Sequence, residues 1–429
     1  MAASRVLTLG LQRDERRTLE PRNATIVAVV LGNALEWYEI VVYGYLATVI
    51  ARLFFPSHDA STSLLLAFAS FGLTYVSRPL GAVVLGVYAD RFGRKTALQL
   101  SIWMMVVASA AIVVVPTYES IGILAPVIVV VSRLLQGFSV GGEFGSATAF
   151  LAEQNPARRG YLASWQFASQ GLTALLATGS AAVLTAMLSP AQVESWGWRM
   201  PFLFGLLLYP IGIYVRAHLM ETPEFRAAMS APLLKLRDHA RSFAIAIGLI
   251  VLGTVAVYTV IFLPTYAVRS LRLAPPDAFA AGVVTGIMQL VFVPMFGALS
   301  DRIGRTPMPI LAALIMLVAS WPALTWLNQD ASVTKLLVLQ AVLGFVSAAY
   351  LGPMPALLAE LFPVRARGAG LSISYAVGVA VFGGLAPLAH AWLIVRTGSP
   401  AAPAIYLAAA AVVSLVALFA ARRIGPPKP

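Results

Sequence analysis

The chain has 429 residues, of which 59% are hydrophobic and only 11% are charged, and its mean hydropathy is +0.83. Soluble proteins keep about a quarter of their residues charged, so this composition excludes a water-soluble protein. At roughly 20 apolar residues per transmembrane helix, the chain has room for about twelve. The absence of cysteine excludes disulfides and thiolate metal sites.

Taken in chain order, the sequence begins with a polar segment, 1–23, which lacks the apolar core of a secretory signal. Six apolar runs follow, at 24–50, 62–89, 96–115, 122–151, 161–188 and 198–216. After a polar linker, 218–241, come six more, at 242–267, 278–299, 308–327, 335–361, 369–392 and 402–421, and then a tail, 423–429. Lipid leaves backbone groups without partners, and continuous apolar runs do not suit barrel strands. We therefore expect an all-α membrane protein with helical bundles at 24–217 and 242–422.

Lysine and arginine are distributed unevenly between the two sides of the predicted bundle. The segments on the side of the termini hold 22 of them, and the segments on the other side hold 6. By the positive-inside rule, both termini are expected in the cytoplasm. This asymmetry also explains the net charge of +12 without a nucleic-acid partner. The remaining two, Arg78 and Arg133, fall inside predicted helices.

The chain also repeats itself. "GVYADRFGRK" and "GALSDRIGRT" align Asp90 with Asp301 at an offset of 211, and "AEQNPARRG" and "AELFPVRARG" align Glu153 with Glu360 at an offset of 207. Both pairs of segments follow corresponding helices, so two six-helix halves of the same orientation are predicted, an architecture of secondary transporters. The charged residues of these loops are predicted to form the cytoplasmic gate: Asp90, Arg91, Arg94, Glu153, Asp301, Arg302, Arg305 and Glu360.

The paired "D-R-x-G-R" loops resemble the signature of the major facilitator superfamily. Within it, "GNALEWYEIVVYGYLA", "RLLQGFSVGGEFGSATAFLAE" and "WGWRMPF" resemble the metabolite:proton symporter family. "SWQFASQ" and "FGGLAPLAHAWLI" are most similar to its bacterial citrate and tricarballylate symporters. The resemblance implies a fold of twelve helices in the bacterial inner membrane, with a substrate site between the halves. Glu39 departs from the family, which usually has Asp there, and this leaves the substrate preference open.

Ionisable residues inside predicted helices suggest where function lies. Asn33, Glu36, Glu39 and Tyr43 fall within about 120° on one helix, and with Arg78, Arg133 and Glu143 they predict a cavity with three acids and two bases. Proton coupling is assigned to Glu36, Glu39 and Glu143. Arginine grips carboxylates with a bidentate fork, and at the repeat offsets the two arginines and Glu143 have neutral polar counterparts. The predicted substrate-binding residues are Asn33, Tyr43, Arg78, Arg133, Gln170, Gln289, Gln340, Tyr350, Ser374 and Tyr375.

These features predict a proton-coupled importer of an organic acid such as citrate, with lipid as its surroundings, no cofactor, a proton as coupling ion and a monomeric state. Alternatives remain open: uptake of a zwitterion such as betaine or proline, a drug exporter, or a channel. Glu36 and Glu39 also have a structural interpretation as salt-bridged contacts between helices. Trp37, with Trp165 and Trp198, is assigned in part to an aromatic belt. "GRKT" lacks the glycines of a nucleotide-binding loop, which excludes an ATP-driven pump, and the four histidines form no metal motif. An enzyme is therefore not expected.

Overall fold

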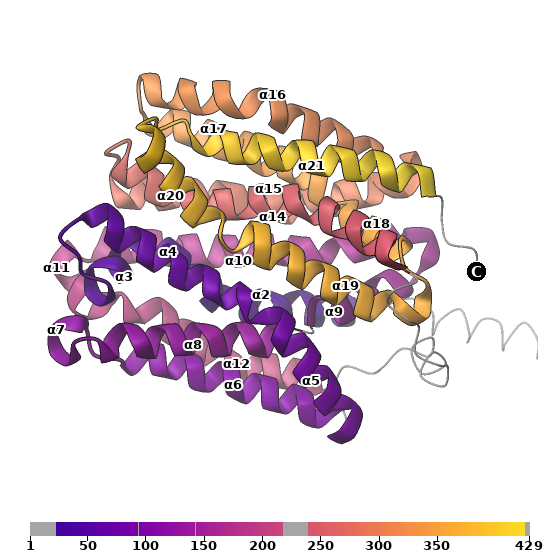
Figure 1. Cartoon of the computed structure of the whole chain (residues 1–429), viewed down its shortest axis with the longest axis horizontal. Helices are drawn as coiled ribbons and strands as arrows, with labels where there is room; N and C mark the ends of the chain where they lie inside the picture. Colours follow the sequence, from indigo (N-terminus) through magenta and orange to yellow (C-terminus); the bar gives the residue numbers. More distant parts are fainter. Residues whose placement is uncertain (1–22, 93, 142, 218–238, 425–429) are drawn as a thin grey trace, which may run out of the picture.

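The computed structural model describes residues 23–92, 94–141, 143–217 and 239–424, which form helices and contain no strand. Figure 1 shows them as a bundle of long, nearly parallel helices. The amino-terminal half consists of α2 (Asn23–Tyr45), α3 (Ala47–Phe54), α4 (Ala60–Val76), α5 (Arg78–Phe92), α6 (Arg94–Val114), α7 (Tyr118–Ile121), α8 (Leu124–Val140), α9 (Glu143–Glu153), η1 (Pro156–Arg158), α10 (Arg159–Met187), α11 (Pro190–Gln192), η2 (Val193–Gly197) and α12 (Arg199–Ala217). The carboxy-terminal half consists of α14 (Ala240–Arg269), α15 (Pro275–Ile303), α16 (Pro307–Gln329), α17 (Val333–Leu351), α18 (Met354–Glu360), α19 (Val364–Gly378), η4 (Val379–Gly383), α20 (Ala386–Thr397) and α21 (Pro403–Ile424).

Every predicted apolar run contains helix, but several runs are broken into two helices. The first bends by 74° between α2 and α3. The second is interrupted at Ser77, because Pro79 has no N–H to continue the helical ladder. Within the described residues, eight helices are long and apolar enough to cross a membrane, and the bent α2–α3 pair is a ninth. The shorter apolar stretches of α6 and α8, together with α12, complete the twelve predicted spans.

Local signals explain where several helices begin and end. Asp59 caps α4, since its carboxylate accepts hydrogen bonds from the backbone N–H groups of Ser61 and Thr62. These bonds, above all those from Thr62, hold the pKa of the Asp59 carboxyl below its ordinary value. α15 ends at Gly304, whose φ of 94° is readily adopted only by glycine.

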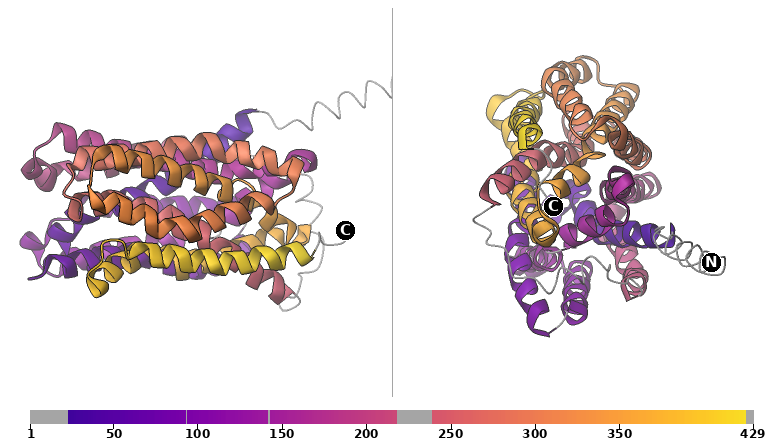
Figure 2. Two further views of the ribbon diagram at one scale, coloured as in Figure 1. Left: turned by 90° about the horizontal axis from the view of Figure 1, so that it is seen from above. Right: turned by 90° about the vertical axis from the view of Figure 1, so that its right-hand side faces the viewer.

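The two halves touch most closely along α10 and α15. A Cβ atom added to Gly171 would lie 2.6 Å from the backbone nitrogen of Leu290, and one added to Gly286 would lie 2.6 Å from that of Leu175. Small residues at these positions let two helix backbones approach directly, as is common between membrane helices. On the other side of the interface, α4 of the amino-terminal half packs against α20 and η4 (Figure 2).

Both ends of the bundle are closed. The end where Asp301 and Arg305 lie, here called the motif end, is joined by ion pairs between the halves. The opposite end carries α3, α7 and α11 (Figure 1). There Phe68 of α4 packs on Phe262 of α14 with ring centroids 5.8 Å apart, within an apolar cluster drawn from both halves. The predicted linker 218–241 falls outside the described residues except for its last three.

Candidate substrate and coupling site

A small cavity lies between the halves at the middle of the bundle. It is lined by Phe167 and Gln170 of α10, by residues of α14 that include Thr254 and Tyr258, and by side chains of α17, α18 and α19. Its free space holds about one water molecule. The structure is therefore a closed conformation whose cavity is too small for a carboxylic acid the size of citrate.

Arg78, at the start of α5, is one side chain away from this cavity. Its guanidinium carbon lies 4.2 Å from the ring centroid of Trp37 and 4.5 Å from that of Tyr75, and Arg78 is only 2% exposed. Its Nε and Nη2 have no hydrogen-bond partner among the described residues. Tyr75 in turn contacts Tyr258, which lines the cavity, with centroids 5.0 Å apart. The site thus offers a fixed positive charge with unused donors.

Aromatic and amide side chains surround this charge. Tyr375 of α19 stacks on Phe144, lies edge-on to Trp37 and accepts a 3.1 Å hydrogen bond from Gln170 Nε2. Gln170 and Tyr375 were both predicted to bind substrate, and the structure brings them together at the cavity. Trp37 was assigned to an aromatic belt, but at 3% exposed it lies in the interior beside Arg78.

Four polar residues, here called the stripe on α2, were predicted to share one helix face. The three of them whose side chains are described, Asn33, Glu39 and Tyr43, contact different neighbouring helices. Asn33 Nδ2 donates to Ser169 Oγ at 2.5 Å, and Gln166 Nε2 donates to Asn33 Oδ1 at 3.1 Å, so Asn33 ties α2 to α10. Tyr43 shares a 2.6 Å hydrogen bond with Ser70 of α4. The side chains of Glu36 and Glu143, both predicted to couple protons, lie outside what the structure describes.

Arg133 is buried inside the amino-terminal half and does not line the cavity. Its Nη1 donates to Gln136 Oε1 at 2.7 Å, its Nη2 donates to the carbonyl of Ile40 at 3.2 Å, and its guanidinium lies 4.2 Å from the Tyr43 ring centroid. Neither arginine lines the cavity in this conformation, and the prediction that both share one site with Glu36 and Glu143 stays a prediction. Arg133 is held by α2 and by its own helix, and it lies over Phe71, whose ring adjoins the Tyr75 ring beneath Arg78.

Glu39 is also fully buried, with no exposed surface. It does not pair directly with Arg133 within ion-pair distance among the described contacts. Instead Gln136 lies between them: its Nε2 donates to Glu39 Oε2 at 3.5 Å and to Ser109 Oγ at 3.0 Å, while its Oε1 accepts from Arg133. On its other side Glu39 packs against Gly205 of α12. The sequence prediction missed Gln136, although its spacing of three residues from Arg133 places both on one helix face.

The neutral residues of the carboxy-terminal half that correspond in the repeat to Arg78, Arg133 and Glu143 lie in different places. They are Gln289, Gln340 and Tyr350. Gln289 lies at the α10–α15 interface, beside Gly171. Gln340 accepts a 2.5 Å hydrogen bond from Thr285, and Tyr350 donates to the carbonyl of Leu249 at 2.7 Å, so both are occupied within their own half. Ser374 is buried, and its hydroxyl has no partner among the described residues.

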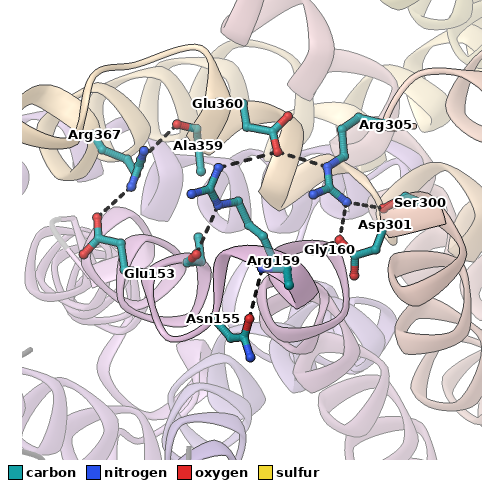
Figure 3. Close-up of polar contacts among 12 residues, drawn as sticks. Glu153, Asn155, Arg159, Gly160, Ser300, Asp301, Arg305, Ala359, Glu360 and Arg367 are labelled. Atoms are coloured by element: carbon teal, nitrogen blue, oxygen red, sulfur yellow. Dashed lines mark hydrogen bonds and ion pairs between the residues drawn. The ribbon is translucent and has the colours of Figure 1, made fainter. Parts of the chain in front are cut away.

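The gate residues form a network at the motif end (Figure 3). Glu153 pairs with Arg367 at 2.9 Å and Glu360 with Arg305 at 3.1 Å, while Arg159 lies 3.7 Å from Glu360. Two of these three contacts, Glu153–Arg367 and Arg159–Glu360, join the halves. Arg159 and Arg367 were not singled out from the sequence, although both stand in the repeated segments "PARRG" and "PVRARG".

Asp301 makes a second kind of contact across the halves. Its carboxylate pairs with Arg305 at 2.6 Å and accepts hydrogen bonds from the backbone N–H groups of Gly160 at 2.8 Å and Tyr161 at 3.0 Å. It thereby caps the start of α10 from the other half. Arg302 is exposed. The side chains of the other predicted gate residues lie outside the described part of the chain: Asp90, Arg91 and Arg94.

Two helical halves with buried charges between two closable ends define a secondary transporter. The chain belongs to the Major Facilitator Superfamily, whose family model matches residues 40–333 and again 245–429. It is therefore a multi-pass membrane protein, as the composition and the repeat predicted.

Similarity to individual relatives shows which members of the superfamily this chain resembles. A citrate-proton symporter of Klebsiella pneumoniae is 37% identical over 403 residues, 92% of this chain and 91% of the relative. One of Salmonella typhi is 34% identical over 399 residues, 91% of this chain and 92% of the relative. A proline/betaine transporter of Escherichia coli (strain K12) is 32% identical over 412 residues, 91% of this chain and 81% of the relative. The crystal structure of a D-xylose-proton symporter is similar in fold, with a TM-score of 0.72 at 18% identity, covering 94% of this chain and 98% of that one.

Proposed function

We propose that the protein imports citrate or a related di- or tricarboxylate together with protons, by alternating access. The observation that carries this proposal is Arg78: a buried, permanently charged guanidinium with unused donors beside a cavity between the halves. The similarity to citrate-proton symporters of two bacteria supports the substrate class.

Arg78 is the residue that binds the substrate in this proposal. A guanidinium binds a carboxylate with two parallel, charge-assisted hydrogen bonds. Opening of either end widens the cavity and brings a carboxylate to Nε and Nη2. Gln170 and Tyr375, already hydrogen-bonded to each other at the cavity, are placed to receive the hydroxyl and further carboxylates of the substrate.

In this proposal, proton coupling depends on Glu39, Gln136 and Arg133. A carboxylate buried this deeply is stable either as the neutral acid or beside a cation, and Gln136 connects it to Arg133 in the closed state. Proton uptake by Glu39 releases Arg133 and Gln136 to rearrange. Co-transport of protons also offsets the cost of moving a polyanion against the membrane potential, ~2.3 kcal/mol per charge per 100 mV.

The orientation and surroundings follow from the charge pattern. We place the motif end, both termini and the linker 218–241 at the cytoplasmic face of a bacterial inner membrane, with bundles at 24–217 and 242–422. The protein works as a monomer among lipids, needs no cofactor and uses H⁺ as its coupling ion. Release of the ion pairs at the motif end then opens the site to the cytoplasm.

Import of a betaine- or proline-like zwitterion is the second candidate, supported by the relatives at 32% identity. The test is uptake of labelled citrate into liposomes that contain the purified protein, with and without an inward proton gradient. We expect accumulation with the gradient, competition by tricarballylate, and none by betaine. Uptake of betaine or proline in place of citrate would overturn the first proposal.

Two variants test substrate binding and proton coupling separately. Arg78→Gln is expected to abolish citrate binding. Glu39→Gln is expected to keep citrate exchange between the two sides of the membrane but to lose accumulation driven by the proton gradient. Loss of exchange and accumulation alike in a folded Glu39→Gln protein would contradict the coupling role.

A further inference from the structure

Four aromatic side chains from both halves, here called the cage, lie beside Arg78, and its guanidinium lies over two of them, Trp37 and Tyr75. Trp37 of α2 and Tyr75 of α4 have centroids 6.3 Å apart, Tyr258 of α14 adjoins Tyr75 at 5.0 Å, and Tyr375 of α19 adjoins Trp37 at 6.4 Å. All four are at most 5% exposed. The face of an aromatic ring is electron-rich and attracts an organic cation, so rings gathered from separate helices at a buried site favour a cation there.

The cage is occupied by a cation of the chain itself. The guanidinium carbon of Arg78 lies 4.2 Å from Trp37 and 4.5 Å from Tyr75, closer to each ring than the rings are to each other. No carboxylate lies within ion-pair distance of it among the side chains that the structure describes. Among the described side chains, the two ring contacts are what stabilises this buried charge at close range.

Arg133 provides the contrast within the same protein. It also lies over a tyrosine, at 4.2 Å from the Tyr43 centroid, but Gln136 and the Ile40 carbonyl accept hydrogen bonds from it. Arg133 is thus held by hydrogen bonds on top of its ring contact. Arg78 is held by rings and keeps donors free.

We propose that Arg78 sets the charge class of the substrate by filling an aromatic cage that would otherwise take a quaternary ammonium compound. With Arg78 in place, the cage repels a second cation and presents N–H donors to an anion. Without it, the same rings form an empty site for a methylated ammonium group such as that of glycine betaine or choline. The anionic side of this inference depends on the proposed function; the ammonium side does not.

The experiment measures binding of tetramethylammonium, choline and glycine betaine to purified protein by quenching of tryptophan fluorescence and by calorimetry. Arg78→Ala is expected to bind at least one of them, with a dissociation constant at least tenfold lower than any that wild type shows. The double variant Arg78→Ala/Trp37→Leu should lose this gain. Arg133→Ala is the matched control, a second buried arginine over a ring, and should gain nothing.

The outcomes separate clearly. A folded Arg78→Ala protein that binds none of the three probes overturns the inference, as does binding that survives Trp37→Leu. If Arg78→Ala fails to fold, Arg78→Gln takes its place in the binding test. Wild type also tests the inference, because tight binding of tetramethylammonium beside Trp37 would mean that Arg78 does not fill the cage. Failure of citrate uptake by wild type would sink the proposed function and leave these binding results unaffected.

Discussion

Glu153 and Arg367 form an ion pair between the two halves, with Oε1 and Nη1 2.9 Å apart and both side chains 6% exposed. Arg367 also donates from Nε to the carbonyl of Ala359 at 2.9 Å, which fixes its position. Removing one member of a buried pair leaves an uncompensated charge and typically costs about 3–5 kcal/mol. The pair therefore stabilises the closed motif end.

Glu153→Gln is accordingly expected to shift the protein toward a conformation open at the motif end. Because the chain has no cysteine, a single reporter introduced as Val257→Cys at the cavity can be labelled with a membrane-impermeant maleimide from either side. Labelling from the motif end should rise severalfold. The charge swap Glu153→Arg/Arg367→Glu should restore protection. Glu194→Gln, which breaks the exposed Arg52 pair within one half, is the control and should change little.

Asp301→Ala is expected to destabilise the start of α10. It removes the acceptor for the N–H groups of Gly160 and Tyr161 and the partner of Arg305. Unsatisfied groups of this kind cost about 1–3 kcal/mol each when buried. Thermal unfolding should show a clear loss for Asp301→Ala and a smaller one for Asp301→Asn, which keeps one acceptor oxygen. Equal losses in the two variants would mean that the charge, and not the cap, is what matters.

Gln136→Leu tests the bridge between Arg133 and Glu39. The substitution keeps the size of the side chain but removes the acceptor for Arg133 and the donor for Glu39. We expect proton-driven citrate accumulation to fall at least tenfold while citrate exchange persists. Ser139→Ala is the matched control, since Ser139 lies three residues further along the same helix and donates a hydrogen bond to the Gln136 carbonyl. Unchanged accumulation in Gln136→Leu would show that Glu39 and Arg133 act without a bridge.

Gly171→Ala tests the close approach of α10 and α15. Its Cβ would meet the Leu290 nitrogen at 2.6 Å, so the halves must separate locally, and both thermal stability and transport rate are expected to fall. Gly179→Ala, on the same helix, would meet nothing within 4 Å. There the better helix propensity of alanine should leave stability equal or slightly higher. Similar effects at both positions would contradict the packing explanation.

Much of the architecture could be predicted from the sequence, because long apolar runs have only one backbone solution in lipid and because the duplicated loops mark one end of each half. The same duplication placed Glu153, Asp301, Arg305 and Glu360 together, since charged motifs at helix ends must meet at one surface. Figure 3 shows these four side chains at one end of the bundle, and their role as a gate stays a prediction.

The interior could not be predicted in the same way. Helical spacing gives the direction of a side chain but not which neighbouring helix it meets, so the stripe on α2 was read as one face although Asn33 and Glu39 contact different helices. Trp37 was misassigned because a tryptophan in a membrane helix is as typical of the interface as of a cation contact. The partners of Asp301 in the other half are backbone N–H groups, which carry no signal in the sequence.

The cap of α10 by Asp301 has a consequence for biosynthesis. Gly160 and Asp301 are 141 residues apart, so a ribosome completes the first half well before the acceptor for this helix end exists. During that interval we expect water to accept the hydrogen bonds of the Gly160 and Tyr161 N–H groups. The amino-terminal half reaches its final form only after α15 has been inserted, and a truncated chain that ends before α15 should be recognised as immature by membrane quality control.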